Sequence, residues 1–203
     1  MEIEEQQIQQ ETLDYLRGVR DDRIALAIVG QDPFPKHATG IPFSKESWHM
    51  QERESSAGFY VLKALGINVD KAKVIFSTPD DLFRALRDQG VVVLNASYFY
   101  RADRKDAGVT WAEDLRASRD PDRGILERAE KVILCGAIAQ RLERLLGLTA
   151  AELRVHPASR NGNNPRGGVA KKWRDQWTVP SLGLLWSNSC VGADKAGLDC
   201  CLL

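Results

Sequence analysis

The sequence predicts an α/β fold, a three-layer α/β/α sandwich around a central, mostly parallel four-stranded sheet. Short apolar runs alternate with segments of helical spacing, and this alternation is typical of a parallel sheet covered by helices on both faces. Ligands of such open sheets bind outside the carboxyl ends of the strands. Three of the runs end directly at polar residues: Ile24–Val29 before Gly30-Gln-Asp-Pro33, Val91–Leu94 before Asn95, and Leu153–Val155 before His156-Pro157. We therefore expect a carboxylate, an amide and an imidazole to converge on one pocket.

The expected helices follow from apolar periodicity and from capping signals. Thr78 is the expected N-cap of a helix that has Pro79 at its first position and ends at Gly90. The other expected helices are Glu2–Arg20, Glu52–Leu65, Trp111–Ser118, Pro121–Ala129, Ala137–Leu146 and Val169–Gln176. The first of them is amphipathic, with candidate buried positions at Ile3, Ile8, Leu13 and Leu16.

The expected strands are short and apolar. They are Ile24–Val29, Lys73–Phe76, Val91–Leu94, Lys131–Cys135 and Leu153–Val155, with a weak strand after Pro180. Two polar loops, 30–48 and 96–109, are too long for plain connections, and long loops at strand ends commonly carry function. Neither a repeat nor a linker interrupts the chain, so we expect one domain over residues 1–203.

The composition supports a single globular domain. The chain has 203 residues, of which 43% are hydrophobic and 28% charged, enough for a real core. Apolar runs near 18 residues are absent, which excludes a membrane span, and the acidic N-terminus is unlike a signal peptide. We expect a cytoplasmic protein. Its four cysteines lack metal-site spacing, so we expect reduced thiols and neither a metal nor a cofactor.

The charge pattern is uneven along the chain. The formal net charge is zero, which argues against a strongly basic nucleic-acid binder. Residues 153–174, however, contain six basic residues and no acidic one. This segment fits either a surface for DNA phosphates or a merely solvated surface.

Four residues carry the candidate chemistry, and each has a plain structural alternative. Asp32, on a stiff turn, suits positioning a water or stabilising a cation, but also suits capping its own backbone. The amide of Asn95 can read the Watson–Crick edge of a pyrimidine, or serve as a turn residue. His156 can stabilise an anionic leaving group or be structural. Phe43 can stack on an extruded base or anchor its loop in the core.

The motifs around these residues resemble the uracil-DNA glycosylase superfamily. Its main family carries GQDPYH, GLAFS, GVLLLN and HPSPLS motifs in that order. The counterparts here are Gly30-Gln-Asp-Pro-Phe-Pro35, Gly40-Ile-Pro-Phe-Ser44, Gly90-Val-Val-Val-Leu-Asn95 and His156-Pro-Ala-Ser-Arg-Asn161. The resemblance covers roughly residues 24–175.

The resemblance implies a monomeric DNA glycosylase that flips a pyrimidine nucleotide out of DNA and hydrolyses its N-glycosidic bond without a metal. Asp32 would position water and stabilise the sugar cation, and a neutral His156 would stabilise the base anion. The implied base-binding residues are Gln31, Phe34, Phe43 and Asn95. The implied DNA-binding residues are Ser44, Ser159, Arg160, Asn161, Arg166, Lys171 and Lys172.

Departures from the family pattern bear on the substrate. Phe34 replaces the Tyr that excludes thymine, Pro35 replaces a His, and Ala158 replaces a phosphate-binding Ser for which Ser159 can substitute. The HPASRN loop and the Thr39-Gly-Ile-Pro-Phe43 run are closer to the single-strand-selective branch.

Three functions stay open at this point. The first is excision of uracil in repair. The second is excision of a modified pyrimidine, such as a hypermodified cytosine in phage DNA, in antiviral defence. The third is DNA binding on the same scaffold without catalysis. A flavodoxin-like nucleotide-binding protein is disfavoured, because Val29 is not followed by a glycine-rich phosphate loop.

Overall fold

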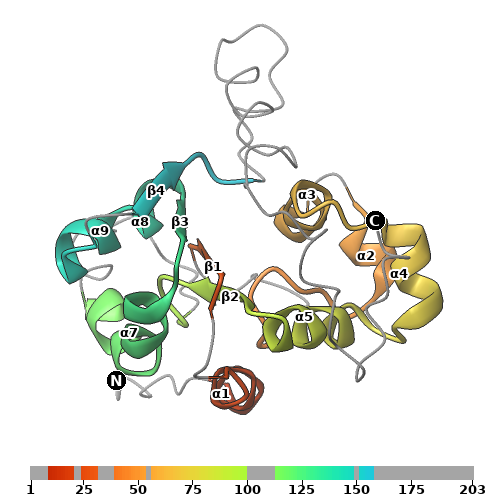
Figure 1. The fold of residues 1–203 in the computed structure, drawn as a ribbon, viewed down its shortest axis with the longest axis horizontal. Helices are drawn as coiled ribbons and strands as arrows, with labels where there is room; N and C mark the ends of the chain where they lie inside the picture. The colour runs from red at the N-terminus through yellow and green to blue at the C-terminus, as the bar shows by residue number, and fades with distance from the viewer. Residues whose placement is uncertain are drawn as a thin grey trace, which may run out of the picture.

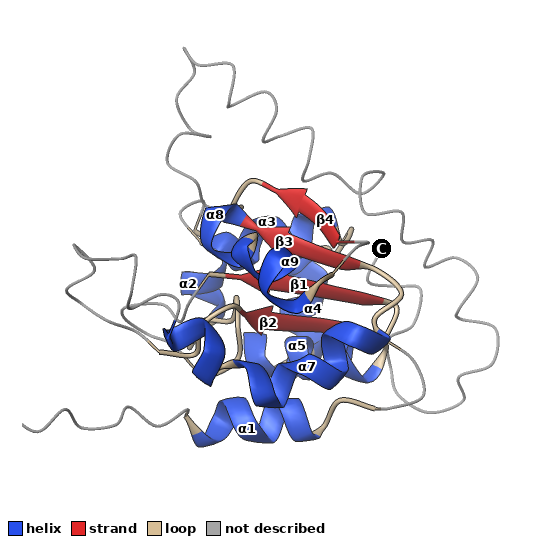
Figure 2. Ribbon diagram, turned by 90° about the vertical axis from the view of Figure 1, so that its left-hand side faces the viewer, coloured by secondary structure: helices blue, strands red, loops and turns tan. Residues whose placement is uncertain are grey.

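A four-stranded, all-parallel sheet forms the centre of the protein (Figures 1 and 2). The computed structural model describes residues 9–20, 24–31, 39–53, 56–99, 113–148 and 151–157. The strands are β1 (Leu26–Gly30), β2 (Val91–Asn95), β3 (Val132–Cys135) and β4 (Ala151–Arg154), in the order β2-β1-β3-β4. Because every pair is parallel, the carboxyl ends of all four strands lie at one edge of the sheet. The predicted four-stranded α/β fold is confirmed.

Helices cover both faces of the sheet, as Figure 1 shows. One face carries α2 (Trp48–Gln51), α3 (Ala57–Ala64), α4 (Val69–Ile75) and α5 (Pro79–Asp88). The other carries α7 (Arg119–Arg128), α8 (Gly136–Ala139) and α9 (Arg141–Leu146). Residues 113–117 are also helical. None of the helices in these described ranges is long and apolar enough to cross a membrane.

The helix α1 (Gln10–Arg17) lies along the edge of the sheet formed by β2. Tyr15 is fully buried, and its hydroxyl oxygen accepts a hydrogen bond from the backbone N–H of Val93 at 3.0 Å. Burial raises the pKa of Tyr15, because the phenolate would lose its hydration. The prediction that Leu16 is buried is confirmed, but Thr12 and Tyr15 are the other buried positions of this helix. The predicted positions Ile3 and Ile8 lie outside the described residues.

The capping prediction for α5 is confirmed. Thr78 Oγ1 accepts a hydrogen bond from the Asp81 N–H at 3.2 Å, and Asp81 Oδ2 accepts one from the Thr78 N–H at 2.9 Å. This reciprocal pair is a capping box, and Pro79 occupies the first helical position.

Three secondary-structure predictions are wrong in type or extent. The predicted helix Glu52–Leu65 begins only at Ala57, as α3, and Glu52 and Arg53 lie in a turn after α2. The predicted strand Lys73–Phe76 is largely the end of α4, whose N-cap Asn68 accepts a hydrogen bond from the Lys71 N–H at 3.1 Å. A four-residue apolar run does not by itself distinguish a strand from a helix. The predicted helix Ala137–Leu146 is divided into α8 and α9, and it begins one residue earlier, at Gly136. The predicted helix Val169–Gln176 and the strand after Pro180 lie outside the described residues.

Candidate active site

The order of the strands places a topological switch point at the carboxyl ends of β1 and β3. From β1 the chain passes through α2–α5 on one face to reach β2, and from β3 it passes through α8 and α9 on the other face to reach β4. The two connections leave neighbouring strands in opposite directions. Ligands of open α/β sheets bind at such a switch point.

Asn95 and Phe43 meet over Gly30 on the α2–α5 side of this edge. Gly30 and Asn95 are register partners, so their Cα–Cβ directions point to the same face. A Cβ added to Gly30 would lie 2.8 Å from Phe43 Cζ and 3.1 Å from Asn95 Oδ1. Phe43 is 5% exposed and Asn95 6% exposed. The aromatic ring and the amide are therefore neighbours held in place by packing, and a glycine is required beneath them.

Phe43 has an unusual backbone conformation. Its φ of 65° lies in the left-handed region, the only such value of a non-glycine residue in the described ranges. Its carbonyl oxygen accepts a hydrogen bond from Gln51 Nε2 at 3.2 Å. A Cβ on Gly58 of α3 would overlap that same oxygen. Such strain persists only where the surroundings enforce it, and it is concentrated at functional sites.

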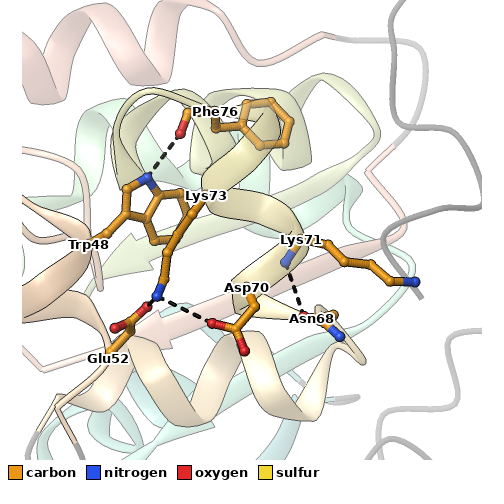
Figure 3. A network of polar contacts seen from close by, with 7 residues as sticks. All are labelled: Trp48, Glu52, Asn68, Asp70, Lys71, Lys73 and Phe76. Carbon is orange, nitrogen blue, oxygen red and sulfur yellow. Dashed lines mark hydrogen bonds and ion pairs between the residues drawn. The ribbon is translucent and has the colours of Figure 1, made fainter.

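A polar network stabilises the helix that supplies Gln51 (Figure 3). Trp48 Nε1 of α2 donates a hydrogen bond to the Phe76 carbonyl oxygen at 2.9 Å. Lys73 of α4 forms ion pairs with Glu52, directly after α2, and with Asp70 at 3.3 Å. These contacts join α2 to α4, so Gln51 approaches Phe43 from a fixed support.

Ser44 has a different role from the one that the resemblance implies. Instead of being available to DNA, it is fully buried, and its hydroxyl donates a hydrogen bond to Asp80 Oδ1 at 2.5 Å. In this arrangement the side chain is not accessible to a DNA phosphate. Its sequence position after Phe43 gives no indication of this internal partner, which is 36 residues away.

His156 follows β4 at the same edge of the sheet. A Cβ on Gly136, directly after β3, would lie 3.1 Å from His156 Cβ, and Gly136 has a φ of 86° that favours glycine. Gln140 Nε2 donates a hydrogen bond to the Arg154 carbonyl oxygen at 2.9 Å, two residues before His156. Burial lowers the pKa of His156 to about 4, because the imidazolium would lose its hydration. The imidazole is therefore neutral at pH 7.

Two further residues of the sequence analysis are described. The backbone carbonyl of Gln31 accepts a hydrogen bond from the Ser97 N–H at 3.0 Å, which extends the pairing of β1 and β2 past their ends. Arg154, one of the six basic residues of the segment 153–174, is 2% exposed and bonded to Glu152 Oε1 through both Nε and Nη2. Its charge is compensated inside the protein, so Arg154 lies neither on a surface for DNA phosphates nor on a solvated one.

The remaining predicted site residues lie outside the described residues. They are Asp32, Phe34, Ser159, Arg160, Asn161, Arg166, Lys171 and Lys172. Their roles stay predictions. Within the ranges that the structure describes, His, Cys, Asp and Glu side chains form no group of three able to hold a metal ion.

Among known proteins, only solved structures are similar to this chain, and their similarity identifies its fold. No protein-family model and no curated protein matches the chain. Among solved structures, wild-type UNG of Nitratifractor salsuginis, a uracil-DNA glycosylase, is similar with a TM-score of 0.50 and 19% identity over 86% of this chain and 79% of that one. A point mutant of the same UNG matches with a TM-score of 0.50 and 20% identity, over 82% and 77% of the two chains. The chain thus shares the α/β fold of a uracil-DNA glycosylase, and the predicted resemblance is confirmed at the level of the fold.

Proposed function

We propose that this protein is a monofunctional DNA glycosylase, which hydrolyses the N-glycosidic bond of a flipped pyrimidine nucleotide and leaves an abasic site. The target base in this proposal is uracil or a related modified pyrimidine. The observation that supports it most is the pairing of an amide and an aromatic ring, Asn95 and Phe43, over Gly30 at the ligand-binding edge of the sheet.

These two side chains suit recognition of a base. An amide offers one acceptor and two donors, which matches the alternating donors and acceptors on the Watson–Crick edge of a pyrimidine. An aromatic ring stacks on the face of any base. Because Asn95 and Phe43 are already packed in place, little conformational entropy is lost when the base enters.

The imidazole of His156 suits stabilisation of the leaving group. In hydrolysis, the water oxygen bonds to C1′ of the sugar, the C1′–N bond breaks, and its electron pair stays on the base. A neutral imidazole keeps one N–H, which can donate a hydrogen bond to the base oxygen that becomes negative. Asn95 ends β2 and His156 lies two residues after β4, and these strands are three positions apart in the sheet, about 14 Å between strand axes.

The other parts of the mechanism rest on the sequence. Asp32, two residues after β1, would position the attacking water, accept its proton and stabilise the positive charge that develops on the sugar. Lys171, Lys172 and Arg166 would neutralise phosphates, which makes DNA affinity dependent on salt. Arg160 and Asn161 would fill the gap in the duplex.

A panel of oligonucleotides tests the proposal. The full chain is incubated with single- and double-stranded DNA that differs only in one base: uracil, 5-hydroxymethyluracil, thymine, cytosine or a modified cytosine. Hot alkali then reveals abasic sites as strand breaks. We expect breaks at one or more of the uracil-like or modified pyrimidines, and a loss of at least about 100-fold in rate for Asp32→Asn, since one electrostatic group at a reacting centre contributes that much.

The outcomes separate the candidate functions. Breaks at uracil support a repair enzyme, and breaks only at modified cytosine support an enzyme directed at modified phage DNA. DNA binding without breaks at any base would reject the glycosylase and support a binding protein on the same scaffold.

A further inference from the structure

We infer that Asp80 is a positioning residue for Phe43, and that its carboxylate sets the placement of the aromatic ring on the target base. This inference rests on the proposed function. Asp80 lies in the first turn of α5, far from Phe43 in sequence and outside the motifs of the sequence analysis.

One oxygen atom of Asp80 binds both ends of the loop that carries Phe43. Thr39 Oγ1 donates a hydrogen bond to Asp80 Oδ1 at 2.7 Å, and Ser44 Oγ donates to the same atom at 2.5 Å. Within the segment 39–44, the Ser44 N–H donates a hydrogen bond to the Ile41 carbonyl oxygen at 3.1 Å. The segment 39–44 is thus closed into a loop, with Asp80 at its base.

The loop is also fixed from the other side. Thr12 Oγ1 of α1 donates a hydrogen bond to the Gly40 carbonyl at 2.6 Å, and Gly40 has a φ of 88°. With Thr39, Gly40 and Ser44 all held by hydrogen bonds, Phe43 cannot easily relax from its φ of 65° to an ordinary value. Relaxation would move the ring away from Gly30 and Asn95.

A carboxylate is well suited to this position. An ionised carboxylate is only an acceptor and has room for several donors, so one oxygen can bind two hydroxyl groups. Its negative charge also lies favourably at the N-terminus of α5. The neighbouring Asp81 is engaged differently, in the capping box with Thr78. Two adjacent acids on one helix therefore have separate tasks, and Asp81 provides a matched control.

The test compares the full-length protein with the variants Asp80→Ala, Asp80→Asn and Asp81→Ala. The first measurement is the single-turnover rate of abasic-site formation on the base that the panel selects. The second is the rate of tryptic cleavage after Lys45 under native conditions, which reports on the loop without requiring catalysis. The melting temperature of each variant controls for a general loss of stability.

We expect Asp80→Ala to lower the single-turnover rate roughly 10- to 100-fold and to speed cleavage after Lys45, because displacement of a positioned group by about 1 Å has effects of that size. Asp81→Ala should lower the melting temperature but stay within about threefold of the wild-type rate. Asp80→Asn should recover most of the activity, since its Oδ1 still accepts both hydroxyls.

Equal effects of Asp80→Ala and Asp81→Ala on both measurements would overturn the inference. If Asp80→Ala does not fold, the variants Asp80→Asn and Ser44→Ala are compared instead. An unchanged rate of cleavage after Lys45 in both variants contradicts the inference. Faster cleavage in Ser44→Ala, with an unchanged rate in Asp80→Asn, supports it. If the wild-type protein forms no abasic sites, the proposed function fails, while the proteolysis result still decides whether Asp80 holds the loop.

Discussion

Gly30 and Asn95 are paired in register at the carboxyl ends of β1 and β2, and the Asn95 amide oxygen lies 3.1 Å from the point where a Gly30 Cβ would stand. The Phe43 ring approaches the same point even more closely. Real Cβ atoms essentially never have neighbours below 3.0 Å. The space occupied by the amide and the ring therefore depends on the absence of a side chain at Gly30.

Substitution Gly30→Ala should displace the Phe43 ring. Overpacking of a filled site destabilises by about 1–3 kcal/mol. We expect a loss of that size in the free energy of unfolding, measured with urea, and a fall of at least about 10-fold in the single-turnover glycosylase rate.

The control is Gly124→Ala in α7, where an added Cβ meets nothing within 4 Å. This exposed helical position should gain about 0.5–1 kcal/mol from the substitution, with an unchanged rate. A Gly30→Ala variant with wild-type rate and stability would show that the ring does not depend on the glycine.

His156 should make stability dependent on pH. Its pKa is lowered from an ordinary 6.5 to about 4 in the folded protein. Between these values the unfolded chain binds a proton that the folded protein does not, so the free energy of unfolding should decrease as the pH falls from about 6.5 to about 4.

The measurement is urea unfolding at several pH values for the wild type and His156→Gln. The difference between the two proteins should show this fall, and NMR titration of the imidazole should give a midpoint well below 6.5. A midpoint near 6.5 would contradict the burial of the ring.

The sequence predicts the edge of the sheet well, because the signals are local. An apolar run that ends at a polar residue occupies a few consecutive positions. Asn95 is the last residue of β2, and His156 lies two residues after β4, which ends at Arg154 rather than at the predicted Val155. The parallel sheet then brings distant strand ends to one edge.

The supports of the site could not be predicted from the sequence. Ser44 and Asp80 are 36 residues apart, and Tyr15 and Val93 are 78 residues apart. No periodic pattern in the sequence relates residues that lie so far apart along the chain. The residues that indicate a turn do not show whether one of its residues has a positive φ. The φ of Phe43 could therefore not be predicted either.

Tyr15 should stabilise the sheet edge through one hydrogen bond. Tyr15→Phe keeps the ring but leaves the Val93 N–H without its acceptor inside the protein. A buried donor left unsatisfied costs about 1–3 kcal/mol, and we expect that loss in the free energy of unfolding.

The control for Tyr15 is Arg17→Ala on the same helix. Arg17 pairs with Asp14 at 2.9 Å on the surface, and such exposed pairs contribute at most about 1 kcal/mol. A loss from Tyr15→Phe no larger than that from Arg17→Ala would indicate that water replaces the hydroxyl at the edge.

Gln140 should act through His156, because its side chain holds the Arg154 carbonyl two residues earlier. Gln140→Ala removes this bond, and the segment after β4 can then shift relative to Gly136. We expect a fall of roughly 10-fold in kcat with little change in KM, since the leaving group is stabilised mainly in the transition state. Arg141→Ala, an exposed neighbour, is the control and should keep the wild-type kcat. A change in KM alone would place the effect of Gln140 on DNA binding rather than on the imidazole.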